Sequence, residues 1–313
     1  MNLAPITLFV YNRPENTAQT LEALSNNDLS SESDLFVFCD GPKENADDDT
    51  KKAIQKVRDV VKSKSWCETV TIYESDTNKG LADSIVEGVT KIVNKFGKII
   101  VLEDDIVTSN GFLKYMNEAL DLYENEKKVM HIASYLPYTN SISSLPETFL
   151  SRFMSCWGWA TWKTDWDKAN WDTQFLYDQI ADSKVRYAFN LEGVLNYHEQ
   201  LENNLNGKIN TWAIKWFTSI FLNKGLCLYP KQTLSENIGL DGSGLHCNEQ
   251  DLSTNFEFDR STKVNKIHIK ESKSGKTYLK RFFKYGYDSS TTKRLKEKYI
   301  QERYKLIKKI KGL

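Results

Sequence analysis

The chain of 313 residues lacks a cysteine framework, a long apolar run and any net charge. Its five cysteines are scattered, odd in number and without a CxxC pair, which argues against a disulfide scaffold or a zinc knuckle and favours a reducing compartment. No apolar stretch approaches the ~20 residues that span a bilayer. The opening MNLAPITLFVYNRP has no basic leader before its short apolar run. We therefore expect a cytoplasmic protein of ordinary globular composition.

The zero net charge hides a strong asymmetry along the chain. Residues 263–313 contain 17 Lys and Arg against four acids, so the preceding 262 residues carry a net charge of −13. The segments YLKRFFKYGY and KRLKEKYIQERYKLIKKIKGL mix basic and apolar residues near helical spacing, which is typical of a helix on a membrane surface or packed on its own domain. We expect residues 256–313 to form a basic helical extension whose partner is an anionic membrane surface, on the inner face of the cell membrane. The positive charge of this extension is the only feature that favours nucleic-acid binding, so we expect no nucleic-acid partner.

The first hundred residues alternate between strand and helix patterns. Apolar strands are expected at 6–12, 34–40, 68–76 and 98–105, with amphipathic helices after Pro14, over 47–64 and over 80–96. This alternation predicts an α/β fold with a mostly parallel, doubly wound sheet flanked by helices. Residues 131–172 are aromatic and lack a regular pattern, whereas helices are expected over most of 173–204 and over 212–224.

Polar residues follow three of the predicted strands. Asn12–Arg13, Asp40–Gly41 and the triplet Glu103–Asp104–Asp105 all stand at carboxyl ends of strands, where open α/β sheets bind their ligands. Three adjacent carboxylates repel one another and require a cation to compensate them. Carboxylate oxygens suit the hard cations Mn²⁺ and Mg²⁺, which leave positions open for substrate phosphates. The triplet could also be a solvated acidic turn, but the apolar strand before it favours a metal site.

Four motifs in this order resemble a known enzyme family. VLEDDIVTSNGFLKYMNEAL, FVYNRPENTAQTLEAL, FCDGP and SCWGWATWKTDWDKANWD are similar to segments of the N-acetylglucosaminyltransferase I family and of bacterial family 2-like sugar transferases. The resemblance covers roughly residues 5–175 and implies the GT-A fold, a nucleotide-sugar-dependent α/β fold with a "DxD" motif at a strand end. It implies a GT-A domain over 1–255, with a nucleotide-sugar-binding half at 1–125 and an acceptor-binding half at 126–255.

The resemblance also implies roles for individual residues. The expected metal ligands are Asp105 and His246, the latter in a glycine-rich loop. Donor contacts are expected from Asn12, Arg13, Asp40, Lys79, Glu103 and Asp104, although a solvated Lys79 is equally compatible with the sequence. The implied reaction moves a sugar from a UDP-sugar to a glycan or glycolipid acceptor, and it is inverting.

The tryptophan-rich segment offers an aromatic platform and a base. Five of the eight tryptophans fall within residues 157–171, as expected for a core cluster or for rings that stack on sugars. Trp171 is the best stacking candidate. An inverting transfer needs a base near the acceptor hydroxyl, and the resemblance assigns Asp172 to that role, with Asp167 in reserve and Asp165 as a surface acid.

Two other classes of function are compatible with parts of the sequence. Nucleotidyl transfer usually requires a glycine-rich, lysine-containing loop near the N-terminus, and FVYNRPENT has none. A non-catalytic carbohydrate-binding protein could use the tryptophans alone, but it needs no paired acids at a strand end. We therefore expect a metal-dependent glycosyltransferase.

Overall fold

The computed structural model describes residues 2–139, 141–239 and 256–286. Its strands are β1 (Ile6–Val10), β2 (Asp34–Cys39), β3 (Thr69–Glu74), β4 (Lys98–Glu103), β5 (Ile106–Thr108), β6 (Val129–Ala133), β7 (Thr148–Ser151), β8 (Trp159–Trp162), β9 (Leu226–Pro230) and β10 (Ser235–Asn237). Its α-helices are α1 (Pro14–Ser25), α2 (Asp48–Lys62), α3 (Leu81–Phe96), α4 (Phe112–Tyr123), α5 (Lys163–Trp166), α6 (Thr173–Gln179), α7 (Ser183–Phe189), α8 (Tyr197–Leu205), α9 (Trp212–Leu222) and α10 (Lys273–Tyr285). Two 3₁₀ turns span Ser30–Glu32 and Ile142–Ser144.

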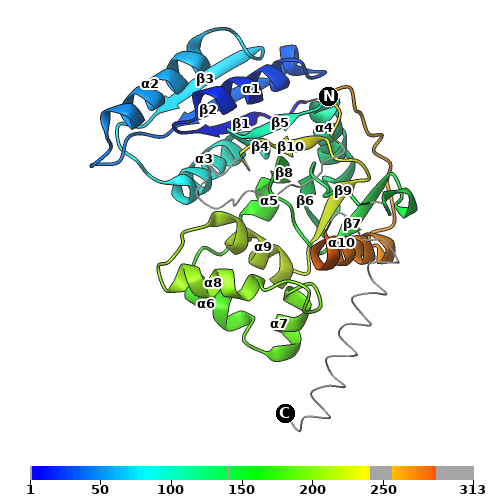
Figure 1. The fold of residues 1–313 in the computed structure, drawn as a ribbon. Coiled ribbons are helices and arrows are strands. Elements are labelled where there is room, and N and C mark those ends of the chain that lie inside the picture. Colours follow the sequence, from blue (N-terminus) through cyan, green and yellow to red (C-terminus); the bar gives the residue numbers. More distant parts are fainter. Residues whose placement is uncertain (1, 140, 240–255, 287–313) are drawn as a thin grey trace.

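Eight strands form the central sheet in the order β3-β2-β1-β4-β8-β6-β9-β7 (Figure 1). The strands β3, β2, β1 and β4 are mutually parallel, β8 runs antiparallel to both of its neighbours, and β9 is parallel to β6. The prediction of an α/β fold with a mostly parallel sheet flanked by helices is confirmed. From β1 the chain proceeds outward to β2 and β3 and then returns to place β4 on the other side of β1. The order of strands therefore reverses between β1 and β4.

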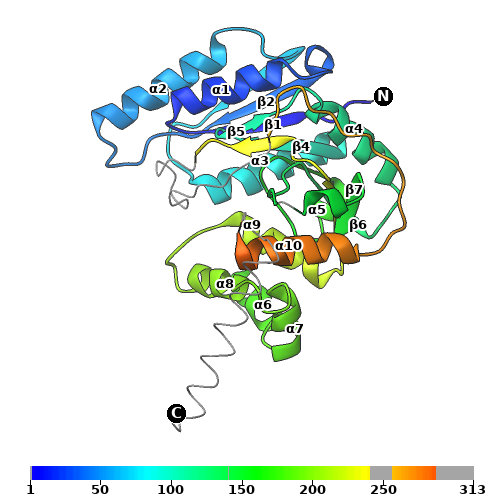
Figure 2. The ribbon, with the colours of Figure 1, turned by 45° about the vertical axis from the view of Figure 1, so that its right-hand side comes forward.

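Helices cover both faces of the sheet because each inner strand is apolar on both sides. Along β1, Ile6 and Leu8 pack into the core beneath α1, α2 and α4, whereas Phe9 packs with Val101 of β4 toward α3 and α9. Figures 1 and 2 show α1 and α2 on one side of the sheet and α3 on the other, with α6, α8 and α9 gathered beyond α3. The two cores hold the β1 and β4 backbones rigidly, up to the residues at their carboxyl ends.

The segment expected to be irregular, residues 131–172, contains most of β6 and all of β7, β8 and α5, so that expectation was wrong. The four-residue strand β8 has no periodic pattern to reveal it, since all four of its side chains, WATW, are buried. Its structure comes from pairing along β4, where Trp159 lies opposite Val101 and Trp162 opposite Lys98. Long-range pairing thus decides a structure that local periodicity does not indicate.

The described part of the expected extension, residues 256–286, packs on the body of the protein. Tyr123 donates a hydrogen bond from its hydroxyl to the carbonyl of Asn265 at 3.0 Å. Helix α10 lies against β7, where a Cβ on Gly275 would meet the ring of Phe149 at 2.2 Å, so only glycine fits. The domain boundaries themselves stay a prediction. Among the described helices, none combines the length and apolar character needed to cross a bilayer.

Candidate functional site

The acidic triplet lies where the sequence predicts it, at the carboxyl end of β4. Glu103 is the last residue of the strand and pairs with Phe9 of β1, while Asp104 and Asp105 form the turn into β5. Asp104 and Asp105 are only 4 % and 8 % exposed. Because β5 pairs with β10, the turn is held from both sides. The carboxylates therefore occupy a fixed position beside the point where the strand order reverses.

Arg13 is the cation that compensates these acids in the described structure. It follows β1 and contacts Asp104 with two guanidinium nitrogens, Nη2 and Nε, the latter 3.4 Å from Oδ2. Its Nη1 lies 3.1 Å from Oδ2 of Asp105. The backbone of Arg13 is fixed as well, because its carbonyl accepts hydrogen bonds from the N–H and the hydroxyl of Thr17 in α1. Arg13 thus joins the ends of β1 and β4.

One arginine does not neutralise three neighbouring carboxyl groups, two of which are buried. Burial raises the pKa of Asp104 to about 6 and also raises the pKa of Asp105, with Arg13 opposing the shift in both. Burial, with help from Asp105 and Asp104, raises the pKa of Glu103 to about 8. Burial lowers the pKa of Arg13, but the two aspartates more than offset this and raise it above its usual value. The acidic triplet therefore carries more negative charge than Arg13 compensates, and a second cation can compensate the remainder.

The end of β10 and the two residues that follow it are a part of this site that sequence reasoning missed. The side chain of Asn237 hydrogen-bonds the carboxylate of Asp105, and the N–H of Ile238 donates to the Asp105 carbonyl at 2.8 Å. A Cβ on Gly239 would lie 2.4 Å from Oδ2 of Asp105 and 2.8 Å from Nη1 of Arg13, so any larger residue there would displace the paired side chains. The sequence signal is the glycine after Asn-Ile, but the sequence does not indicate that this glycine lies beside Asp105, because that depends on the pairing of β5 with β10.

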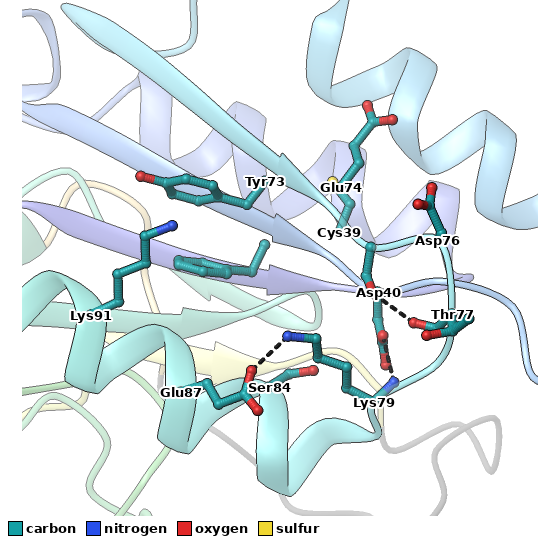
Figure 3. A pocket seen from close by; sticks show the side chains of 12 residues that line it. Cys39, Asp40, Tyr73, Glu74, Asp76, Thr77, Lys79, Ser84, Glu87 and Lys91 are labelled. Carbon is teal, nitrogen blue, oxygen red and sulfur yellow. Dashed lines mark hydrogen bonds and ion pairs between the residues drawn. The ribbon is translucent and has the colours of Figure 1, made fainter.

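Asp40 follows β2 and holds the turn before α3. Its Oδ1 accepts hydrogen bonds from the N–H groups of Gly41 and Lys79, and its Oδ2 accepts from the side chain of Asn78 and the N–H of Gly80, all at 2.9–3.0 Å. A carboxylate offers about four acceptor positions, so these donors use them all. Figure 3 shows Asp40 beside this turn. The observed role is structural, and a contact of Asp40 with a nucleotide stays a prediction.

A cavity of about 660 Å³ opens beside Asp40, between the ends of β2 and β3 and helix α3 (Figure 3). Tyr73 lies on its wall, with the Nζ of Lys91 3.6 Å from the ring centroid. Lys79 lines the same cavity, and its Nζ is 2.6 Å from Oε2 of Glu87. The phosphate contact expected of Lys79 would have to break this exposed ion pair. Asn12, two residues after β1, is half-buried, and its expected contact with a nucleotide stays a prediction.

The structure does not bring Trp171 and Asp172 to the carboxylates by any contact among the described residues. Strand β8 leaves the sheet beside Lys98, at the amino end of β4, and the N–H of Asn170 then bonds Ser219 near the carboxyl end of α9 at 3.0 Å. Trp171 packs on Trp166, with ring centroids 4.9 Å apart. The exposed carboxylate of Asp172 caps α6, accepting from the N–H of Phe175 at 3.1 Å. Their roles as platform and base stay predictions.

The two acids named beside Asp172 differ from each other. Asp165, expected at the surface, is 6 % exposed and pairs with Lys168 at 2.6 Å, so that expectation was wrong. Burial raises the pKa of Asp165, and the ion pair with Lys168 opposes the shift. Asp167 is exposed and pairs with Lys163 at 2.5 Å.

The donor set agrees with a metal bound jointly with a substrate. In the described ranges, no three His, Cys, Asp or Glu side chains are grouped closely enough to hold a metal on their own, and His246 lies outside those ranges. Mg²⁺ and Mn²⁺ commonly use one or two carboxylates and complete their coordination with water and substrate phosphates. Asp105 and Asp104 supply two carboxylates of this kind, so the residues fit such a cation.

Comparison with models of known protein families gives no match, and comparison with curated protein sequences gives none either. Among solved structures, TarS of S. aureus aligns with a TM-score of 0.37 and 12 % identity over 74 % of this chain and 36 % of the TarS chain. A cytidylyltransferase from Leptospira borgpetersenii serovar Hardjo-bovis aligns with a TM-score of 0.31 and 12 % identity over 58 % of this chain and 66 % of that one. UDP-glucose pyrophosphorylase complexed with UDP-glucose aligns with a TM-score of 0.30 and 10 % identity over 53 % of this chain and 79 % of that one. This chain thus spans about a third of TarS.

Proposed function

We propose that this protein is a metal-dependent, inverting glycosyltransferase that uses a UDP-sugar, with UDP-GlcNAc the first donor to test. The acceptor would be a surface glycan or a lipid-linked oligosaccharide. The observation that carries the proposal is the pairing of Arg13, after β1, with Asp104 and Asp105, after β4. This pairing spans the reversal of strand order, where open α/β sheets bind their ligands. The resemblance of the EDD segment to sugar transferases supplies the choice of reaction.

The residues of the site have distinct parts in this proposal. Asp105 would ligate Mn²⁺ or Mg²⁺, with Asp104 or Glu103 holding metal-bound water, the ribose or sugar hydroxyls. When bound, the cation would act as a Lewis acid that offsets the negative charge developing on the departing β-phosphate. Arg13 would hold the aspartates in place before the substrate binds and then contact the nucleotide. Asn237 would keep the carboxylate of Asp105 oriented toward the diphosphate.

Three further residues complete the donor site in the proposal. Asn12 and Asp40 would border the nucleoside at the ends of β1 and β2. Lys79 would reach a phosphate after releasing Glu87, which is a small cost for an exposed ion pair. Trp171 and Asp172 would take part only if the acceptor extends to α6. In that case Trp171 would stack on a sugar and Asp172 would act as the base.

The experiment measures UDP release from a panel of UDP-sugars with Mn²⁺ and with EDTA. Wild type should turn over only with the metal, and Asp105→Asn should lower kcat/KM roughly 100-fold or more, since one preorganised electrostatic group is lost. The matched control is Asp49→Asn on α2, whose side chain is 93 % exposed, and it should leave turnover unchanged.

Three outcomes would contradict the proposal. Metal-independent UDP release that survives Asp105→Asn would remove the carboxylates from the reaction. Release of pyrophosphate from UTP and a sugar 1-phosphate, without UDP release from any UDP-sugar, would instead identify a nucleotidyltransferase. Metal-dependent binding of UDP without turnover, measured by calorimetry, would leave only a binding function.

A further inference from the structure

Helix α10 presents a fixed outward face. Ser272 caps its amino end by accepting a hydrogen bond from the N–H of Gly275. The buried Tyr278 donates its hydroxyl to the carbonyl of Pro137 and accepts from the N–H of Thr139, both at 2.8 Å. Leu279 is fully buried in the core. These contacts clamp one side of α10 to the body, so the opposite side must face outward.

The outward face of α10 is basic. The helix contains five Lys and Arg and no acid, namely Lys273, Lys276, Lys280, Arg281 and Lys284. Glu192, which follows α7, pairs with both Lys276 and Lys280. Among the described residues, no acid lies within ion-pair distance of Lys273, Arg281 or Lys284. The face therefore keeps an excess of positive charge after its local pairs are formed.

Aromatic rings stand beside this charge in a groove of about 690 Å³ between α10 and residues 187–194. Tyr187 is 56 % exposed, and Tyr285 and Phe283 line the opposite wall together with Arg281 and Lys284. Tyrosine rings flanked by long basic side chains match the boundary between lipid headgroups and acyl chains, where a ring enters the apolar layer and its hydroxyl stays hydrated.

The chain beyond α10 continues the same charge. Residues 287–313 lie outside the described ranges, but their sequence has nine Lys and Arg against three acids. By contrast, residues 1–262 carry a net charge of −13. An anionic surface would attract α10 and repel most of the body, so it would orient the molecule as well as hold it.

We propose that the groove between α7 and α10, formed by Tyr187, Arg281, Lys284 and Tyr285, docks on the surface of an anionic lipid bilayer. Helix α10 packs on β7, the edge strand farthest from β3 in the sheet order. Docking there leaves the carboxyl ends of β1 and β4 clear of the bilayer. The inference does not depend on the reaction proposed above, because UDP release in solution tests that reaction separately.

The test is co-sedimentation of the full chain with vesicles of phosphatidylcholine alone or with added phosphatidylglycerol. Wild type should bind only the anionic vesicles, and added salt should release it. The double variant Arg281→Glu/Lys284→Glu should bind at least about tenfold more weakly, because it reverses two charges at the contact. The control Lys51→Glu/Lys56→Glu changes net charge equally on exposed positions of α2 and should bind like wild type. Circular dichroism verifies that both variants fold.

Each other outcome overturns the inference. Equal binding to neutral and anionic vesicles, or no binding to either, removes the anionic surface as the partner. Equal loss in both double variants shows that net charge acts without a docking site, and unchanged binding of Arg281→Glu/Lys284→Glu places any contact elsewhere. Displacement of wild type from vesicles by a DNA duplex at the same ionic strength would assign the groove to nucleic acid instead.

Discussion

The acidic turn after β4 and the tryptophan-rich segment of residues 157–171 are both unusual in sequence, and the end of that segment, Trp171 with Asp172, was expected at the same active site as the turn. In the structure they differ. The turn stands at the carboxyl edge of the sheet and is tied to Arg13. The tryptophans enter the core: Trp159 is fully buried and stacks near Trp212 and His131, at 5.1 and 5.3 Å. A charged cluster at a strand end indicates a site, whereas aromatic composition alone does not.

The physical reason is the cost of burial. A buried carboxylate without a partner is expensive, so a group of three has to be explained by a cation or a ligand. A buried tryptophan is favourable by itself and needs only a partner for its N–H. The four predictions below test this difference, from the largest expected effect to the smallest.

Trp216→Ala should be the most damaging of these changes to stability. The ring is fully buried, lies 5.1 Å from the ring of Trp166 and donates its Nε1–H to Nδ1 of His131 at 3.2 Å. Its removal leaves a cavity and an unpaired histidine nitrogen, so the free energy of unfolding should fall by about 3–5 kcal/mol. Urea denaturation measures it. Trp171→Ala, at a half-buried position, is the control and should cost clearly less; equal losses would contradict the placement of Trp216 at the centre of the core.

Arg13→Gln should destabilise the metal-free protein by about 2 kcal/mol, because two buried aspartates lose their counter-ion while partial exposure of Arg13 limits the loss. In the proposed function a divalent cation would compete with Arg13 for these carboxylates. Mn²⁺ should therefore stabilise the variant more than wild type, as measured by the urea midpoint with Mn²⁺ and with EDTA.

Arg58→Gln provides the matched control for that experiment. Arg58 lies in α2 and pairs with Glu74, the last residue of β3, at 3.6 Å; it also donates to the carbonyl of Ser75. It is therefore another arginine that compensates an acid at a strand end. Arg58→Gln should lower the free energy of unfolding, and Mn²⁺ should not stabilise this variant more than it stabilises wild type. Equal stabilisation of wild type and both variants by the metal would mean that Asp104 and Asp105 do not bind it.

Local sequence patterns predicted part of the fold and of the candidate site, whereas contacts between distant segments could not be predicted. The first four strands, their parallel pairing and the position of Glu103–Asp105 follow from apolar periodicity and the α/β alternation, and the structure confirms them. The pairing of Asn237 with Asp105 could not be predicted, because it depends on the pairing of the two three-residue strands β5 and β10, which are separated by residues 109–234. Strand β8 was missed because WATW has no alternation. Asp40 was identified as a polar strand end, but the four donors that surround it arise from the turn before α3.

The core that contains the tryptophans has a titratable group of its own in His131. Trp216 donates to its Nδ1, so the proton of the neutral ring lies on Nε2, which donates to the carbonyl of Ser155 at 2.9 Å. Burial lowers the pKa of His131 to about 3 from a usual value of 6.5. Below pH 6.5 the unfolded chain takes up a proton that the folded protein does not. Stability should therefore decrease from pH 6.5 toward pH 3, by at most ~1.4 kcal/mol per pH unit.

To measure this contribution, the free energy of unfolding is determined for wild type and for His131→Gln between about pH 7.5 and pH 5. This range brackets the usual pKa of histidine. The variant starts from a lower stability but should lose the part of the slope due to His131. The carboxyl groups at the β4 end contribute equally to both proteins and cancel in the difference. Identical slopes would show that His131 is protonated in the folded state as readily as in the unfolded chain.

Asp172→Asn should have the smallest effect, and it decides whether the tryptophan-rich segment takes part in the chemistry. Asparagine caps a helix about as well as aspartate, so the hydrogen bond from Phe175 persists and stability should stay at the wild-type value. A catalytic base would lose roughly 10²–10⁴-fold in rate on this change. Because the segment leaves the sheet at the amino end of β4, opposite the carboxylates, we expect UDP release near the wild-type rate, measured with Asp167→Asn as a parallel control. A large loss of kcat at unchanged stability, in Asp172→Asn alone, would return the base to Asp172 and show that an acceptor bridges the two regions.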